Sequence, residues 1–518
     1  MRDVVVKKNI IDRAYEYFAP QIARDRYRAR MTLASADAYH GASKSRRGLS
    51  EWSVARGDSD TVTEFELQEL RDRSSDLLRN DPLACGIINT KVTKIIGGGL
   101  KLQSRIDAAY LGISDDQAEE IETGFEREFS LWANSIDCDA ERTSNFYDFQ
   151  GLAERSRLEK GDCLVVMPHY RHAYQQIPYN TKFQIIEAER ISNPNWQSNT
   201  DTFVDGVEKD INGAPIRYHF TLSHPGKTRS SKSMSWASVD AFDKKTGRRN
   251  AIHLLHKKRP GQTRGIPDLA PVIEPLKMLS RYTEAELMAA VISGMFTVFI
   301  KTENAAGFQP MEPSADIGGK ASDKDFKMSS GAILNLGLNE SIETANPGRP
   351  NDSFDPFVLA ILRQIGVAVE IPFEILIKHF TSSYSAARAA MLEAWQYFIV
   401  RREAHAKNLC EPFYELVATE AVAMGRVVAP GFLAGDRSVK MAYLGSEWIG
   451  PPRGQINELA ENEADVIAED RGWKTVSQNT AERGGNWEAK HRQRVKEVNL
   501  RRAQGLEIES QPKKELKK

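Results

Sequence analysis

The sequence predicts an α+β fold in which a helical stretch, a β-rich stretch and a second helical stretch follow one another along the chain. Apolar residues recur at helical spacing between Thr63 and Ile96, and again beyond Leu269. Between these stretches lie short runs rich in β-branched residues, and two of them flank Asn212-Gly213, a dipeptide typical of hairpin turns. A chain of 518 residues has room for about three structural units.

The composition is that of a folded globular protein without a strong charge bias. Apolar residues make up 41%, and 70 Lys and Arg balance 71 Asp and Glu to a net charge of −1. A large cationic surface for nucleic acid needs a basic excess, so any DNA contact is expected to be weak or local. The cysteines are far apart and form no CxxC pair, which predicts reduced thiols in a cytosolic setting: Cys85, Cys138, Cys163 and Cys410.

Neither a membrane span nor a secretory signal is predicted. The longest apolar run, from Leu287 to Ile300, is shorter than the roughly 20 residues that cross a bilayer. The first residues, MRDVVVKKNIIDRAYEYF, carry charges throughout and contain no long apolar stretch of the signal-peptide kind.

The N-terminal segment, residues 1–50, is basic. It holds eleven Lys and Arg against five Asp and Glu. Two interpretations stay open: a solvated terminus, or an arm that lies on a neighbouring subunit or on nucleic acid.

Helices are predicted before the β-rich stretch and strands within it. Two helices between Thr63 and Ile96 end at Gly97-Gly98-Gly99, and a third runs from about Ser114 to Trp132. The runs CLVVMP, KFQIIEAERI and AIHLLH predict strands at 163–168, 182–191 and 251–256.

Two helices flanking a small insert come next. The first runs from about Leu269 to Met295, and the second begins at Asp355-Pro356, interpreted as an N-cap and a first-turn proline. The insert contains the strand-like runs TVFI at 297–300 and GAILNL at 331–336. One apolar face of each helix is expected to be buried, within the chain, against another subunit, or both: Leu276, Leu279, Leu287 and Ala290 on the first, and Val358, Ile361, Leu362, Ile365 and Val369 on the second.

No catalytic, cofactor or metal site is predicted. The Gly226-Lys227-Thr228 sequence resembles a phosphate-binding loop, but Thr221 stands where that loop requires glycine. The group Cys163, His169 and His172 lacks a fourth ligand nearby, so a zinc site is not indicated.

Two basic clusters have open interpretations. His256 to Arg259 together with Arg264 could be a solvated turn, a subunit contact or a phosphate contact. Lys378 and His379 lie on a short hydroxyl-rich segment, where one or two cations per chain would form a ring of charge if the protein assembled cyclically.

Seven motifs, in this order, resemble the lambda-type bacteriophage portal, or head-tail connector, proteins. The resemblance covers residues from about 35 to about 508. The motifs are AYHGA (38–42), LRNDPLACGIINTKV (78–92), ERISNPN (189–195), GQTRG (261–265), APVIEPLKMLSRYTEAELMAAVIS (270–293), SYSAARAAMLEAW (383–395) and WIGPPRG (448–454).

The resemblance implies a portal-type fold with an α/β wing, a two-helix stem, a small α/β clip and a helical crown, assembling as a ring. The implied segments are a basic arm (1–50), wing (51–268), stem helix (269–296), clip (297–352), stem helix (353–371), tunnel loop (372–387), long wing helix (388–430), crown (431–504) and disordered tail (505–518).

The implied function is that of a non-enzymatic portal subunit: a dodecameric ring at one capsid vertex of the virion, assembled in the host cytoplasm. The implied partners are the terminase large subunit, capsid or scaffold protein, head-completion proteins and the double-stranded DNA that passes through. A ring-forming head-tail adaptor without the packaging role is the alternative. The residues assigned to the DNA channel are Lys378, His379, Thr381, Ser382 and Ser383, and those assigned to the stem interface are Leu276, Leu279, Leu287, Val358, Ile361 and Ile365.

Overall fold

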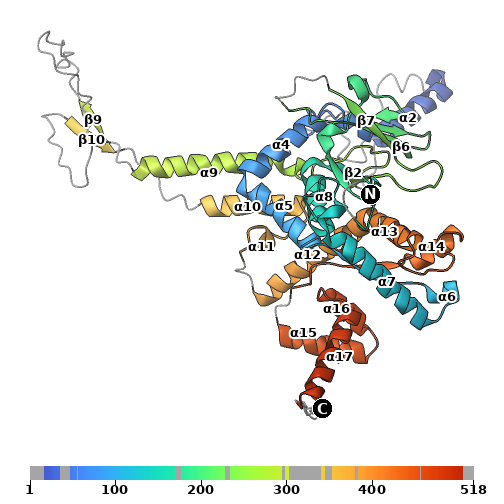
Figure 1. Cartoon of the computed structure of the whole chain (residues 1–518). Helices are drawn as coiled ribbons and strands as arrows, with labels where there is room; N and C mark the ends of the chain where they lie inside the picture. Colours follow the sequence, from blue (N-terminus) through green and yellow to red (C-terminus); the bar gives the residue numbers. More distant parts are fainter. Residues whose placement is uncertain are drawn as a thin grey trace, which may run out of the picture. The chain divides into compact units, whose positions relative to one another are not determined.

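The structure is a computed structural model (Figure 1). The chain divides into two units, residues 1–65 and 66–518. The first unit contains α2 (Pro20–Ser35) and the short α3 (Ser59–Thr63), whose N-cap Asp58 accepts a hydrogen bond from the Thr61 N–H at 2.9 Å. The described residues are 17–35, 47–54, 56–170, 177–227, 234–294, 298–302, 340–344, 353–379, 383–454 and 457–505.

The two helices expected before Gly97 are α4 (Leu67–Asn80) and α5 (Pro82–Ile95). The break between them is at Asp81, whose carboxylate accepts a hydrogen bond from the Ala84 N–H at 2.8 Å and so caps α5. Pro82 occupies the first helical position, where the missing N–H has no intrahelical partner to lose.

Helix α7 (Asp115–Asn134) starts where the sequence places it. Ser114 and Gln117 form a reciprocal capping box, which satisfies two backbone N–H groups at the start of the helix. One face of α7 buries Phe129 and Trp132 in the main hydrophobic core. Strand β1 (Lys101–Ser104) and helix α6 (Ala108–Leu111) precede α7, and α8 (Phe146–Lys160) follows it.

The β-rich stretch forms two separate antiparallel sheets. The first has the order β3-β2-β8, and the second contains β4 to β7 in consecutive order. Asn212-Gly213 connects β5 to β6, with Gly213 at a φ of 84°, so this predicted hairpin is confirmed. The strands are β2 (Asp162–Val166), β3 (Gln184–Glu187), β4 (Phe203–Val204), β5 (Val207–Lys209), β6 (Pro215–Thr221), β7 (Trp236–Asp240) and β8 (Ala251–Leu255).

The strand predicted over 182–191 is shorter than expected. It ends at Glu187, and Ala188–Arg190 form a 3₁₀ turn. Here the chain leaves the sheet, because the Ala188 carbonyl accepts a hydrogen bond from Arg264 at 2.7 Å instead of pairing with a strand.

The long helix after residue 383 is continuous through a wide turn. It consists of α12 (Tyr384–His405), a π-helical turn (Ala406–Cys410) and α13 (Glu411–Ala423). Pro412 has no N–H to donate, which favours a local change of hydrogen-bond pattern just before it. Phe413 and Tyr414 then face the main core with the aromatic residues of α7.

The segment 431–449, the first part of the predicted crown, contacts the main core. Strand β11 (Ser446–Ile449) pairs antiparallel with β1, and Phe432 and Tyr443 are buried in the main core. These contacts make 431–449, including α14 (Arg437–Tyr443), part of the body of the molecule. The separate C-terminal helices are α15 (Glu458–Asp470), α16 (Val476–Glu482) and α17 (Trp487–Ala503).

Helix α17 contacts α7 beside two carboxylates. Glu122 and Glu126 on α7 accept hydrogen bonds from the backbone N–H groups of Ile106 and Ser104. Burial raises the pKa of Glu126 to about 7, and Glu488 of α17 adds to the rise, while the hydrogen bond from Ser104 opposes it. No helix in the described part of the chain has the length and apolar character of a membrane span.

We expect Glu126→Gln to flatten the pH dependence of stability. A carboxyl with a pKa of about 7 in the folded chain and about 4.3 when unfolded contributes most to stability below that lower value, and its contribution is lost as the pH rises through 7. The free energy of unfolding in urea, measured at pH 5 and pH 8, should therefore favour the variant over the native chain more strongly at pH 8. Glu119→Gln, at an exposed position of the same helix, is the control, and an equal effect of both substitutions would contradict the expectation.

Candidate subunit interface and channel segment

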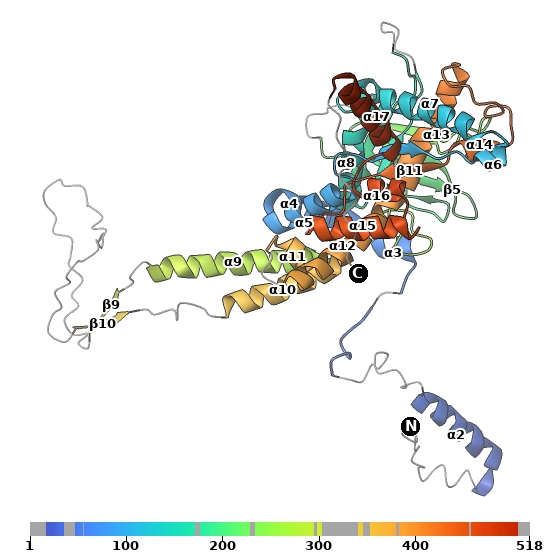
Figure 2. The same ribbon diagram turned by 90° about the horizontal axis from the view of Figure 1, so that it is seen from below.

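Two helices pack side by side and leave the body of the molecule together (Figures 1 and 2). They are α9 (Ile273–Gly294) and α10 (Phe354–Ala368). Helix α10 begins earlier than predicted: Ser353 is the N-cap residue, and Asp355 lies in the first turn, where its charge still favours the helix dipole.

The base of this helix pair belongs to the core of the chain. Leu276 and Leu279 of α9 are buried with Leu362 and Ile365 of α10, in one cluster with apolar residues of α4 and α5. Each of these side chains therefore stabilises the monomer, irrespective of any contact with another subunit.

The outer part of α9 carries the same apolar face without a cover. Tyr282 packs on Phe354 and Phe357, with ring centroids 5.6 and 5.2 Å apart, at the first turn of α10. Beyond this point α9 continues past the start of α10, as both views show. Leu287 and Val291 follow Leu276 at helical spacing and are 65% and 46% exposed.

The six residues assigned to the stem interface thus fall into three groups. Leu276, Leu279 and Ile365 are buried within the chain, Val358 and Ile361 are partly buried, and Leu287 is exposed. A contact of any of them with a neighbouring subunit stays a prediction. Leu287 is the member of the set that offers uncovered apolar surface.

The insert between the two helices contains an antiparallel pair of strands. These are β9 (Val298–Thr302) and β10 (Glu340–Thr344), with Ile300 opposite Ile342. The predicted strand at 331–336, and most of the range 297–352, lie outside the described residues.

After α10 the chain makes a tight, partly buried turn. Gly366 allows the Ile371 carbonyl to approach, because a Cβ at this glycine would lie 2.8 Å from that oxygen. Ile371 and Leu376 are buried in the same core cluster as the base of α9. The short α11 (Phe373–Leu376) therefore presents the next residues from a fixed support.

Lys378 and His379 are exposed and are the last described residues before position 383. Lys378 has a left-handed backbone (φ 55°), and the His379 N–H donates a hydrogen bond to the Glu374 carbonyl at 3.1 Å. Ser383 is also exposed and occupies the N-cap position of α12 without a capping hydrogen bond from its side chain, and its hydroxyl lies 3.2 Å from that of Ser385. Thr381 and Ser382 lie outside the described residues.

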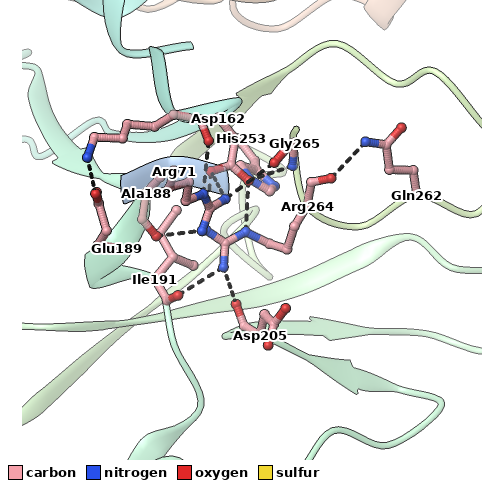
Figure 3. Close-up of polar contacts among 11 residues, drawn as sticks. Arg71, Asp162, Ala188, Glu189, Ile191, Asp205, His253, Gln262, Arg264 and Gly265 are labelled. Carbon is pink, nitrogen blue, oxygen red and sulfur yellow. Dashed lines mark hydrogen bonds and ion pairs between the residues drawn. The ribbon is translucent and has the colours of Figure 1, made fainter. Parts of the chain in front are cut away.

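A buried ionic cluster connects α4, β2 and β8 to the loop that leads into α9 (Figure 3). The Asp162 carboxylate, at the start of β2, accepts hydrogen bonds from Arg71 at 2.9 Å, from Arg264 at 2.8 Å and from the Gly265 N–H at 2.8 Å. His253 of β8 donates to the same carboxylate at 3.1 Å. Arg264 also donates to the Ile191 and Asp205 carbonyls, which links the two sheets.

The charges in this cluster are fixed by one another. Burial alone would raise the pKa of Asp162, but Arg264, Arg71 and His253 outweigh that effect and hold it well below its usual range. Burial lowers the pKa of Arg71 to about 10, which still leaves it charged at neutral pH. A fully buried carboxylate is tolerated here because every side of it meets a donor.

Two glycines make room for this cluster. Gly161 has a φ of 93°, and a Cβ on either Gly161 or Gly265 would lie within 2.4 Å of the other residue's carbonyl oxygen. Any larger side chain would push the loop 261–265 away from β2 and separate Arg264 from Asp162.

Arg402 makes a second set of polar contacts between segments that are distant in the sequence. Arg402 of α12 donates to the Ile95 carbonyl at 3.1 Å and to the Pro451 carbonyl at 3.0 Å. Gly450 lies so close that a Cβ there would be 2.4 Å from the Arg402 guanidinium. Sequence reasoning assigned no role to Arg402 or Asp162; a single Arg or Asp beside an apolar run was the only available signal.

The described residues contain no group of three or more His, Cys, Asp or Glu side chains that could hold a metal ion. Cys163 is fully buried in β2, and burial raises the pKa of its thiol well above the usual range. The basic turn at 256–259 and Arg264 have different environments: Arg264 is buried in the ionic cluster, whereas Lys257 and Lys258 are exposed.

Residues 45–402 match the family described as phage portal protein, lambda family. This match covers more than half of the chain, and the chain belongs to the lambda family of phage portal proteins. It is 25% identical over 493 residues to the portal protein of Escherichia phage N15, covering 90% of this chain and 91% of the relative. It is 24% identical over 491 residues to portal protein B of Escherichia phage lambda, covering 90% of each chain.

Solved structures with a similar chain come from gene transfer agent (GTA) particles. A chain in the virion of the native GTA particle matches with a TM-score of 0.39 at 12% identity, covering 81% of this chain and 93% of that one. A chain in the neck of the native GTA particle, computed with C12 symmetry, matches with a TM-score of 0.38 at 12% identity, covering 79% and 92%.

We expect Asp162→Asn to destabilise the chain strongly. The substitution leaves Arg71 and Arg264 buried without a counter-charge, a change that costs about 3–5 kcal/mol in comparable buried pairs. Thermal unfolding of the purified protein measures the loss. Asp240→Asn is the matched control, because its pair with Arg217 has a similar length of 2.6 Å but lies at the surface, and it should change the melting temperature little. Equal decreases in the melting temperature of the two variants would show that the buried cluster stabilises the chain no more than the surface ion pair does.

Proposed function

We propose that the chain is the subunit of a closed homo-oligomeric ring, a dodecamer, that surrounds the DNA channel of a phage portal. The observation that carries this proposal is the uncovered apolar end of α9, together with membership of the portal family. Leu287 and Val291 continue a face whose inner part is already buried. In the proposed ring, a second copy of the subunit buries this exposed face.

The interface is heterologous: the outer face of α9 meets a different surface of the next subunit. Interfaces of this kind form closed rings when the rotation between neighbours divides a full turn. Burial of the exposed Leu287 and Val291 side chains contributes about 1.5–3 kcal/mol each when complete, and every interface of the ring repeats the gain.

The channel segment is 372–387, with Lys378, His379 and Ser383 as the described residues that meet DNA. Few cations suit this role, because each neutralised phosphate adds to the affinity and tight binding would hold the DNA in place. The chain as a whole has a net charge of −1, which fits a conduit through which DNA slides.

The ring occupies one vertex of the capsid, where the terminase large subunit pumps DNA in and head-completion proteins later attach. Assembly takes place in the host cytoplasm, against capsid or scaffold protein. The role is structural, and the chemical step of packaging belongs to the terminase.

We expect Leu287→Asp to abolish ring assembly while the subunit stays folded. The side chain is exposed in the isolated chain, so folding tolerates the charge, whereas an unpaired carboxylate buried between subunits costs several kcal/mol (about 2–7 for a polar group). Mass photometry counts rings, and circular dichroism confirms folding.

Leu222→Asp is the matched control for this test, with the same chemistry at a leucine that is 59% exposed beside β6. Ile365→Asp would not serve, since Ile365 is buried within the chain and its substitution unfolds the subunit. Rings at native yield from Leu287→Asp would show that the outer face of α9 is not an interface.

We expect Lys378→Ala combined with His379→Ala to leave ring assembly intact and to reduce the retention of packaged DNA. Both side chains are exposed at the tip of the segment, so their loss removes phosphate contacts without opening a core. Electron microscopy of rings and a DNA-retention assay on filled heads measure the two effects. Lys244→Ala with Lys245→Ala is the control, and unchanged retention in the tip variant would contradict the assignment.

A further inference from the structure

The C-terminal helices carry opposite charges. Helix α15 has six carboxylates and no Lys or Arg, whereas α17 has six Lys and Arg and two Glu. Such separation is unusual in a chain whose Lys and Arg balance its Asp and Glu almost one to one. The contacts of each helix show which of these charges are used within the chain.

Helix α15 is attached through one face and leaves another free. Arg483 after α16 binds Asp465 at 2.6 Å, and Asn479 of α16 binds Glu469 at 2.7 Å. The free face is formed by residues spaced four, three and four apart, which places them on one stripe of the helix. They are Leu459, Glu463, Val466 and Asp470.

This free face of α15, the acidic face, is apolar as well as charged. Leu459 is 72% exposed and Val466 is 55% exposed. Glu463 and Asp470 are exposed beside them and make no hydrogen bond or ion pair among the described residues. Two uncovered aliphatic side chains that alternate with two unpaired carboxylates are suited to a protein surface that offers cations.

Helix α17 is attached by the side opposite to its main row of cations. Glu488 binds Arg105 at 3.1 Å, and Arg492 binds the Thr123 hydroxyl at 3.3 Å. At about 100° per residue, Lys490, Arg494 and Arg501 lie together on the far side of the helix. This basic face is exposed, and within the part of the chain that the structure describes the side chains of its three cations make no hydrogen bond or ion pair.

The two faces match in length as well as in charge. The acidic face runs from 459 to 470 and the basic face from 490 to 501, each about 16 Å at 1.5 Å per residue. Val498, partly covered, lies next to the cations and offers apolar contact to Leu459 and Val466. Among the described residues, no hydrogen bond or ion pair joins the two faces within one chain.

We infer that the acidic face of one subunit, Leu459, Glu463, Val466 and Asp470, packs against the basic face of the next, Lys490, Arg494 and Arg501. This inference rests on the proposed ring, in which such a heterologous pairing recurs at every interface. Each exposed ion pair contributes little alone, about 0.2–1 kcal/mol, but all copies act together. Protein is a better occupant of these faces than DNA, because Glu497 lies within the basic face and the acidic face would repel phosphate.

The test is a pair of charge-reversed full-length chains. Variant A carries Glu463→Lys and Asp470→Lys, and variant B carries Lys490→Glu and Arg494→Glu. Alone, each brings like charges together at every interface, and we expect at least a tenfold loss of complete rings at low salt, counted by mass photometry. Mixed together, A and B form complementary contacts in both orders, and the count of rings should return to within about twofold of the native count. A single chain with all four substitutions should recover in the same way.

The control is Lys244→Glu with Lys245→Glu, which changes the net charge as variant B does and should leave rings unchanged. Native ring counts in A and B, or folded variants that do not recover on mixing, would overturn the inference while the ring itself stands. Loss of duplex DNA binding by B, with rings intact, would instead assign the basic face to DNA and also overturn it. A native chain that forms no rings under any salt condition would overturn both this inference and the proposed function.

Discussion

The Asp162 carboxylate is the constraint on which the arrangement of the molecule depends. It lies at the start of a central strand and receives donors from α4, from β8 and from the loop that leads into α9. Arg264 then extends the same contact to the second sheet through backbone carbonyls. A buried ion set of this kind contributes less to net stability than to uniqueness, because any other docking of these elements would leave a buried charge unpaired.

Local signals in the sequence were sufficient for the elements that cap themselves. Ser114 with Gln117 defines a helix start through contacts within four residues, and this helix was predicted to begin at about Ser114. The strand after Lys182 was predicted too long, because its end is decided by Arg264, more than seventy residues away. Asp162 itself could not be recognised, since its partners lie 91 and 102 positions distant and nothing local distinguishes a buried aspartate from an exposed one.

The apolar residues of α9 also show how far the structure could be predicted from the sequence. Helical periodicity placed Leu276 and Leu287 on one face, and the structure agrees with that spacing. Periodicity does not show which residues pack against a helix face. Here the packing changes along the helix: Leu276 is buried in the core of the chain, whereas Leu287 is exposed. The proposed channel segment rests on family resemblance, and the structure adds a buried base at Ile371 and Leu376. The contact of segment 431–449 with the main core could not be predicted locally either, because β11 pairs with β1 over more than 340 positions.

The state of the cysteines has a practical consequence. Burial raises the pKa of Cys138 to about 12 and also raises the pKa values of Cys163 and Cys410 well above the usual range, so these thiols present almost no thiolate at neutral pH. Cys85 is half-buried and accepts a hydrogen bond from Asn89. A chain with Cys85 replaced by serine would therefore offer a nearly silent background to maleimide reagents. A single cysteine introduced at the tip of the channel segment, or on either face of the C-terminal helices, could then carry a fluorophore and report distances within an assembling particle.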